Sequence, residues 1–308
     1  MAYDKDVIYK RLRGYRLKGY LACDAPLAEE TSFRIGGPAD ILIKPDNVAE
    51  AVKVVKLCKR ERIPLTVLGN GTNVLVSDRG IRGIVMKLGG LRELRRERDR
   101  VFAGAGARMS DVCGYAASES LSGLEFACGI PGSAGGAVYM NAGAYGFEMM
   151  DIVYRSVIMD RDGDIGVLNV EDHEFAYRKS VFHGNGLIIL ETEFALKDGE
   201  RDDILKKMDE YMARRGASQP VEMPSAGSVF RRPAAEGVYA GPLIEKCGLK
   251  GARIGGAEVS EKHAGFIVNR GGATAADVLS LIKRVQDEVR GRFSIELAVE
   301  IKMIGEWD

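Results

Sequence analysis

Ser228 is a candidate catalytic residue in the stretch Pro224–Pro233, PSAGSVFRRP, where small residues lead to a single hydroxyl. Glycine and alanine add little bulk, so this backbone can come close to a ligand. A serine nucleophile needs a base, and the stretch lacks the G-x-S-x-G elbow of serine hydrolases. A serine that donates a proton needs only a proton path and a basic carbon atom to meet. The residues therefore favour a proton donor, with a serine hydrolase as the weaker alternative.

Arg178 is a candidate for binding an anion, because it lies between aromatic residues in Phe175–Phe182, FAYRKSVF. A planar guanidinium can donate two parallel hydrogen bonds to a carboxylate or a phosphate. The commoner alternative is a surface arginine with a structural ion pair. Glu300, near the end of the chain, has the pattern of a solvent-facing charge.

Two glycine-rich stretches are candidates for binding a phosphate-bearing ligand. In Val67–Asp78, VLGNGTNVLVSD, residues 69–71 follow a strand and can present N–H groups to phosphate oxygens. The return to a strand argues against a Rossmann site. In Gly129–Gly146, GIPGSAGGAVYMNAGAYG, the lack of bulk suits a planar ligand, with Asn141 and Tyr145 as polar tips. A purely structural loop remains the alternative for both stretches.

The elements around the glycine-rich stretches predict an α+β domain. Residues 39–45 and 64–69 read as buried strands, and residues 47–60 between them have apolar residues at helical spacing. Closely spaced strand candidates then continue to about residue 198, with one clear helix at about residues 110–120. Short strands joined by Gly and Asp turns indicate mainly antiparallel pairing.

A charged stretch at Lys197–Asp203 is a candidate domain boundary. The residues after it predict an amphipathic helix whose apolar face contains Ile204, Leu205, Met208, Tyr211 and Met212. Thr274 and Asp277 form a T-x-x-D cap before a helix with an apolar stripe. Alternating residues from 295 to 303 predict a closing strand with one buried face.

The composition places the chain among globular proteins of ordinary two-domain size, with 308 residues and 46% hydrophobic content. Lys+Arg and Asp+Glu both total 44, which implies no general attraction to nucleic acid. The five cysteines are spread out and the three histidines lack ligand spacing, so we expect no disulfide framework, no metal and a reducing setting. The N-terminus lacks the apolar core of a secretory signal. Phe126–Phe147 is uncharged but rich in glycine, which argues against a membrane span.

Eight motifs, in order from about residue 31 to the end, resemble the UDP-N-acetylenolpyruvoylglucosamine reductase family. They are TSFRIGGPAD (Thr31–Asp40), LGNGTNVLVSD, GIPGSAGGAVYMNAGAYG, YRKSVF, PSAGSVFRRP, GPLIEKCGLKG (Gly241–Gly251), HAGFIVN (His263–Asn269) and VEIKMIGE. Members of this family are cytoplasmic flavoenzymes of bacterial peptidoglycan synthesis. The resemblance implies an N-terminal arm (residues 1–30), an FAD-binding domain of the vanillyl-alcohol-oxidase (PCMH) type (31–198) and a smaller α+β substrate-binding domain (199–308).

The resemblance also implies a reaction and a set of residues. NADPH reduces FAD, and hydride then passes to the enolpyruvyl ether of UDP-N-acetylglucosamine to give UDP-N-acetylmuramate. The proton donor falls on Ser228, and the groups that bind and polarise the enolpyruvyl carboxylate fall on Arg178 and Glu300. The FAD-binding positions fall on Gly69, Asn70, Gly71, Thr72, Asn73, Gly129, Pro131, Gly132, Ser133, Gly135, Gly136, Asn141 and Gly143.

Two positions depart from the family pattern: Lys302 stands where arginine is common, and Glu30 precedes Thr31 where histidine is frequent. Arg214 and Arg215 are candidates for holding the substrate diphosphate. A flavin- or nucleotide-binding protein without this chemistry is the second hypothesis. The joint presence of Ser228, Arg178 and Glu300 argues against it, because binding alone does not require all three.

Overall fold

The computed structural model describes residues 3–233 and 237–307, so residues 1 and 2 of the predicted arm lie outside the described part. Packing divides the chain into two compact units that interleave along the sequence. The first comprises Met1–Cys23, Asp40–Asn70 and Gly83–Arg214, and the second comprises Asp24–Ala39, Gly71–Arg82 and Arg215–Asp308. This division differs from the predicted boundaries at residues 30 and 198, because two short N-terminal segments pack with the C-terminal half.

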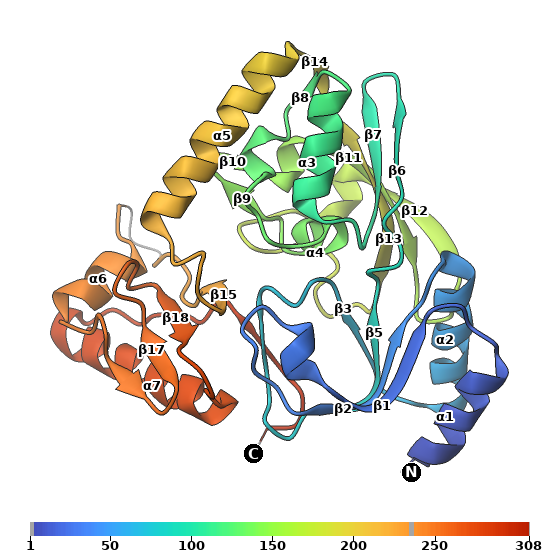
Figure 1. Cartoon of the computed structure of the whole chain (residues 1–308), viewed down its shortest axis with the longest axis horizontal. Helices are drawn as coiled ribbons and strands as arrows, with labels where there is room; N and C mark the ends of the chain where they lie inside the picture. Colours follow the sequence, from blue (N-terminus) through green and yellow to red (C-terminus); the bar gives the residue numbers. More distant parts are fainter. Residues whose placement is uncertain (1–2, 234–236, 308) are drawn as a thin grey trace. The chain divides into compact units, whose positions relative to one another are not determined.

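The first unit opens with a four-stranded sheet in the order β1-β2-β5-β3. Its strands are β1 (Tyr20–Pro26), β2 (Pro38–Lys44), β3 (Leu65–Leu68) and β5 (Ile81–Lys87). Helix α2 (Val48–Glu61) connects β2 to β3, which confirms the predicted β-α-β opening, and Asn47 caps it by accepting from Glu50 N. Apolar residues of α1 (Lys5–Gly14) and α2 share one core with this sheet, beside which Figure 1 shows both helices.

The second sheet of this unit is antiparallel throughout, in the order β12-β11-β13-β7-β6. Its strands are β6 (Leu94–Glu97), β7 (Arg100–Gly104), β11 (Val153–Met159), β12 (Ile165–Asn169) and β13 (Ile188–Ala195). Helices α3 (Met109–Ser118) and α4 (Ala134–Tyr139) contribute to the same core. The predicted antiparallel α+β domain and its helix near residue 110 are thus confirmed.

Short elements complete the first unit. They are β8 (Leu121–Ser122), β9 (Gly143–Ala144), β10 (Phe147–Glu148), β14 (Lys197–Asp198), η2 (Glu125–Ala127), η3 (Met149–Asp151) and η4 (Val170–His173). The uncharged stretch at residues 126–147 is therefore divided between brief helices and strands. Within the described residues, no helix has the length and apolarity needed to cross a membrane.

Helix α5 (Arg201–Ser218) forms as predicted, and its apolar face is partly covered. Ile204 is buried, whereas the side chains of Leu205 and Met212 are 37% and 48% exposed. Met208 and Tyr211 are half-buried and pack against the core of the first unit, so the predicted apolar face is covered in part. The boundary between the two units falls near the end of this helix, so the helix does not pack on a single core along its length.

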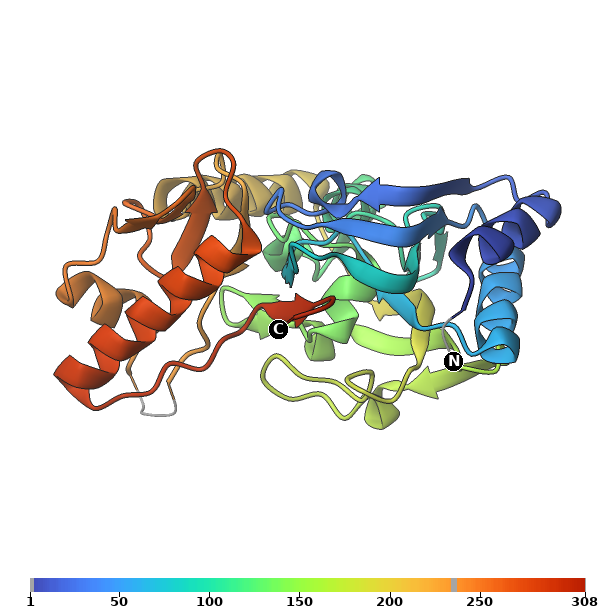
Figure 2. The ribbon, with the colours of Figure 1, turned by 90° about the horizontal axis from the view of Figure 1, so that it is seen from below.

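The second unit is built on the antiparallel sheet β15-β18-β17-β16. Its strands are β15 (Ser225–Ser228), β16 (Arg253–Ile254), β17 (Ala257–Val259) and β18 (Phe266–Asn269), accompanied by η1 (Leu27–Glu30) and α6 (Ala240–Lys246). Helix α7 (Ala275–Phe293) packs against this sheet, along which it runs in Figure 2. Thr274 and Asp277 form the predicted capping box.

The closing segment of the second unit is only partly a strand. Residues Lys302–Ile304 form β19, which pairs in parallel with β4 (Val74–Val76). Leu297 and Ile301 are buried, but Met303 is 50% exposed. The predicted alternation of burial therefore holds from residue 295 to 301, but the regular strand is limited to the last residues, because the chain reaches β4 only at its end.

Candidate active site

The predicted catalytic residues belong to both compact units. Arg178 lies in the first unit, and Ser228 and Glu300 lie in the second.

Arg178 occupies a strained two-residue turn. Ala176 and Lys179 exchange two backbone hydrogen bonds of 3.0 Å, which leaves Tyr177 and Arg178 at the tip. Arg178 has a φ of 54°, in the left-handed region that residues other than Gly and Asn rarely adopt. Backbone strain of this kind is concentrated at functional sites, where the surrounding structure holds it in place.

The guanidinium of Arg178 lies over the glycine-rich loop. Its Nη1 donates to Asn141 O at 3.5 Å and its Nη2 donates to Gly143 O at 3.3 Å. Both distances exceed the usual range of about 2.7–3.2 Å, so these bonds are weak. A carboxylate or phosphate would accept shorter, charge-assisted bonds from the same fork.

Asn141 is a packing residue of this loop in the structure. Its side chain is fully buried, and its Nδ2 donates to Glu148 Oε2 at 2.8 Å and to Ala176 O at 3.1 Å. Its Oδ1 accepts from Met150 N at 3.0 Å. The amide therefore fastens the loop to the turn of Arg178 and does not form the exposed polar tip that we expected. Glu148 is the partner that sequence reasoning missed, and no pattern pointed to it.

Tyr145 also turns inward instead of presenting a polar tip. Its hydroxyl donates to Tyr211 O at 2.7 Å, and the two rings stack at 4.1 Å. The guanidinium carbon of Arg214 lies 4.9 Å from the centre of the Tyr145 ring. Helix α5 therefore contacts the glycine-rich loop through Tyr211 and Arg214, a connection between residues too distant in sequence for pattern analysis to detect.

The two predicted cofactor loops meet in the first unit. A Cβ on Gly69 would lie 2.5 Å from Ser133 Oγ, and Asn70 Nδ2 donates to Pro131 O at 3.4 Å. Gly69 must therefore be glycine for the loops to approach this closely. Gly69 and Asn70 remain half-buried, so the accessible surface here is largely main chain.

The start of α4 is equally closely packed. A Cβ on Gly135 would lie 2.8 Å from the Cβ of Ala105, and Ser133 Oγ accepts from Gly136 N at 3.3 Å. Gly129 and Gly132 are half-buried and carry no side chain. This surface of backbone fits a flat, phosphate-bearing group such as FAD, which needs close approach to N–H groups.

The remaining loop positions belong to the second unit. Gly71 has a φ of 66°, and a Cβ there would lie 2.5 Å from Glu30 O. Asn73 O accepts from Lys302 N at 2.9 Å, which joins this loop to the closing strand, and Thr72 between them is half-buried.

Ser228 lies at the end of β15, next to a glycine with left-handed backbone. Gly227 has a φ of 78°, and the register between β15 and β18 shifts before Ser228. Ser228 Oγ donates to Phe230 O at 3.2 Å. A Cβ on Gly265 would lie 3.4 Å from this hydroxyl and 3.0 Å from His263 Cε1, so glycine at that position leaves the hydroxyl accessible.

His263 does not form a serine–histidine dyad with Ser228 in the described contacts. Its Nδ1 accepts from Gly265 N at 3.1 Å, while the serine hydroxyl donates to a carbonyl. Burial is the largest cause that lowers the pKa of His263, which keeps the imidazole neutral. The geometry therefore gives no support to the serine hydrolase alternative.

Glu300 lies on the segment next to that of Ser228. Glu300 N donates to Val229 O at 2.7 Å, and Arg231 N donates to Ala298 O at 2.9 Å. The structure thus brings two of the three predicted catalytic residues onto neighbouring extended segments of one unit.

Two cations lie close to Glu300. Burial lowers the pKa of Lys302, nearby Arg231 lowers it further, and Glu300 opposes both effects. Arg231 Nε is buried and has no hydrogen-bond partner among the described residues. Buried N–H groups are rarely left unpaired, so Arg231 is a candidate for binding a polar group of a ligand.

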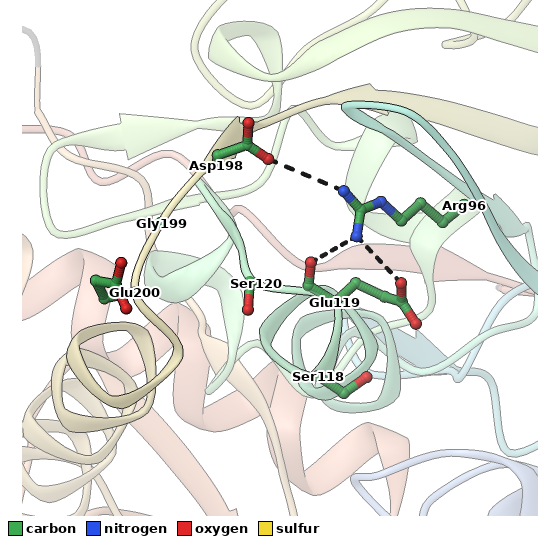
Figure 3. A pocket seen from close by; sticks show the side chains of 7 residues that line it. All are labelled: Arg96, Ser118, Glu119, Ser120, Asp198, Gly199 and Glu200. Carbon is green, nitrogen blue, oxygen red and sulfur yellow. Dashed lines mark hydrogen bonds and ion pairs between the residues drawn. The ribbon is translucent and has the colours of Figure 1, made fainter.

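A separate surface cavity of about 670 Å³ lies in the first unit, lined by Arg96, Ser118, Glu119, Ser120, Asp198, Gly199 and Glu200. Figure 3 shows Arg96 between Glu119 and Asp198. Its Nη1 lies 3.2 Å from Glu119 Oε2, and its Nη2 lies 3.9 Å from Asp198 Oδ1. None of the predicted site residues lines this cavity. In the described part of the chain, no group of three or more His, Cys, Asp or Glu residues could hold a metal ion.

Family models match the two halves of the chain. Residues 39–169 match an FAD-binding domain, and residues 219–304 match the C-terminal domain of UDP-N-acetylenolpyruvoylglucosamine reductase. A BBE-like 1 variant from Physcomitrella patens, with a TM-score of 0.50 at 17% identity, shares only the fold over 62% of this chain and 44% of its own. Fold and loops together define a flavin-dependent oxidoreductase.

The reductases themselves are far more similar to this chain. One from Clostridium botulinum (strain 657 / Type Ba4) is 47% identical over 92% of each sequence, and one from Caldanaerobacter subterraneus is 46% identical over 98% of this chain and 99% of its own. The crystal structure of the reductase from Thermus caldophilus has a TM-score of 0.78 at 35% identity, covering 93% of this chain and 99% of its own. The chain belongs to the UDP-N-acetylenolpyruvoylglucosamine reductase family, which confirms the resemblance seen in the motifs.

Proposed function

We propose that Arg178, Ser228 and Glu300 carry the chemistry of this reductase and that NADPH is its source of hydride. The reaction that family membership assigns is the FAD-dependent reduction of enolpyruvyl-UDP-GlcNAc in peptidoglycan synthesis. When bound, FAD supplies the hydride-transfer chemistry. Main chain at Gly69 and Asn70, at residues 129–146 and at Gly71–Asn73 would hold this cofactor.

Ser228 acts as the proton donor in this proposal. The observation that carries it is that Ser228 Oγ donates to the carbonyl oxygen of Phe230. A carbonyl oxygen can only accept a hydrogen bond, so the hydrogen lies on Ser228 Oγ. The hydroxyl therefore keeps its proton and is not activated as a nucleophile. During reduction, the proton on Oγ passes to the substrate carbon next to the one that receives hydride, which completes the lactyl ether.

Arg178 and Glu300 bind the substrate carboxylate and stabilise the charge that develops on it. The bonds from Arg178 to two loop carbonyls are long, so a carboxylate can replace them with stronger ones. The positive charges of Arg231 and Lys302 near Glu300 offset the repulsion between two carboxyl groups at this place.

We also propose that residues 31–198 serve FAD and residues 199–308 serve the substrate, while α1 and β1 of the predicted arm, residues 1–30, pack with the first sheet. The two family models fall within these limits, which supports the assignment. The reaction supplies a precursor of the cell wall, so the protein would act in the cytoplasm and contribute to cell shape and division.

The test is the absorption spectrum of the purified protein. A yellow protein, or a colourless one that turns yellow with FAD, is expected. NADPH should bleach the flavin band and enolpyruvyl-UDP-GlcNAc should restore it, with NADH tested in parallel. A protein that takes up no FAD would contradict the account, and bleaching that the substrate does not reverse would indicate a flavoprotein without this chemistry.

A further inference from the structure

His173 is fully buried at the start of residues 173–182, the segment that carries Arg178. Its Nδ1 is 2.7 Å from Asn169 O, and a carbonyl only accepts, so Nδ1 carries the hydrogen. Its Nε2 then accepts from Ser156 Oγ at 2.9 Å, and that oxygen lies 3.4 Å from Thr192 Oγ1. These contacts fix the tautomer and orientation of the ring against strands β11 and β13.

The same residue joins the two ends of the segment. His173 O accepts from Val181 N at 2.7 Å, and its ring packs on Phe175 at 4.9 Å and on Phe182 at 5.4 Å. His173 therefore contacts residues on both sides of Arg178, namely Phe175 before it and Val181 and Phe182 after it.

Other hydrogen bonds of the segment lead to residues 139–143, which Arg178 also contacts through Asn141 O and Gly143 O. Ala176, Tyr177 and Lys179 are exposed. Ser180 Oγ donates to Tyr139 O at 2.7 Å, and Asn141 reaches Ala176 O from the glycine-rich loop. A strained turn persists only when its surroundings hold it, and most of its own residues face solvent.

We propose that His173 is a positioning residue for Arg178: by closing the segment from 173 to 182, it holds the guanidinium where the substrate carboxylate binds. This inference rests on the proposed role of Arg178. His173 is fully buried, so we expect its effect to pass through the turn.

The test uses the complete FAD-loaded protein and measures the two half-reactions separately. His173→Phe keeps an aromatic ring of similar size but loses both hydrogen bonds. We expect reoxidation of the reduced flavin by enolpyruvyl-UDP-GlcNAc to fall about 10-fold to 100-fold, because displacing a binding group by about 1 Å has effects of this size. Reduction by NADPH should stay within about twofold.

A double-mutant cycle distinguishes the two proposals. In an Arg178→Ala background, His173→Phe should cause no further loss, since the group that it positions is gone. An equal loss in both backgrounds, or no loss from His173→Phe alone, would overturn the positioning role. If Arg178→Ala itself leaves the substrate half-reaction unchanged, the proposed role of Arg178 fails instead.

Two further variants guard against misfolding. Ser156→Ala removes only the hydroxyl that binds Nε2 and should weaken the substrate half-reaction in the same direction, by a few-fold. Val101→Ala, in the buried core of β7, should lower the melting temperature yet spare both half-reactions. If Val101→Ala reproduced the selective loss, the effect would be general destabilisation, and the proposal would be wrong.

Discussion

Arg178 and Ser228 both lie where the backbone turns left-handed, but the residue that adopts this conformation differs between the two places. At Arg178, the residue with left-handed backbone is itself the functional residue, with a φ of 54°. At Ser228, the left-handed residue is the neighbouring Gly227, with a φ of 78°, and the serine continues a strand. Left-handed backbone costs an ordinary residue about 1–2 kcal/mol but costs glycine little. The fold therefore holds strain in the turn of Arg178 and avoids it beside Ser228.

The largest expected effect comes from Arg178→Gly, which tests the strained side of this comparison. The substrate half-reaction should fall about 100-fold or more, as when one donor to a developing negative charge is removed. The free energy of unfolding should rise by about 1 kcal/mol, because glycine relieves the left-handed backbone. Stopped-flow reoxidation and urea unfolding check both. A less stable protein with normal turnover would contradict the strain argument.

Gly227→Ala tests the backbone beside Ser228, and its expected effect on the free energy of unfolding is smaller than the loss of activity in Arg178→Gly. A Cβ at Gly227 would meet nothing within 4 Å, so backbone strain is the only cost, about 1–2 kcal/mol of stability. Gly114→Ala is the matched control, because its Cβ would also meet nothing within 4 Å and it lies inside helix α3. That change should stabilise by about 0.5–1 kcal/mol. Equal stabilities for the two variants would show that no strain is introduced beside Ser228.

The smallest effect is on pH dependence, where each region contributes one histidine. Burial is the main cause that lowers the pKa of His173 and that of His263. The unfolded chain, with a histidine pKa of about 6.5, then binds protons more readily than the folded one. Stability should be highest above about pH 6.5 and decline as the pH falls below it, because the unfolded chain then binds more protons than the folded one. His173→Phe should flatten the decline; an unchanged profile would exclude His173 as a contributor.

Much of the fold followed from local patterns. The β-α-β opening, the antiparallel strands and the cap at Thr274 depend on residues close in sequence, and all appear in the structure. The apolar face predicted for α5 is covered only in part, because an apolar stripe does not say whether another element covers each of its residues. Leu205 and Met212 remain exposed.

Motifs in the sequence pointed to the residues of the candidate site but not to the side-chain contacts among them. The motifs gave the family, but they did not reveal that Asn141 fastens the turn of Arg178 or that Tyr145 binds helix α5. These partners are 35 and 66 residues apart in sequence. Such contacts exist only once the sheet and loops have packed, so neither spacing nor periodicity reports them.

The central claim is that Ser228 delivers a proton and does nothing else in the reaction. Stopped-flow measurement of Ser228→Ala, loaded with FAD, tests it most directly. We expect reduction by NADPH to stay within about twofold of the unaltered protein. Reoxidation by enolpyruvyl-UDP-GlcNAc should slow by at least about 100-fold, the usual size of a general-acid contribution. Equal losses in both half-reactions, or an unchanged reoxidation rate, would contradict the claim.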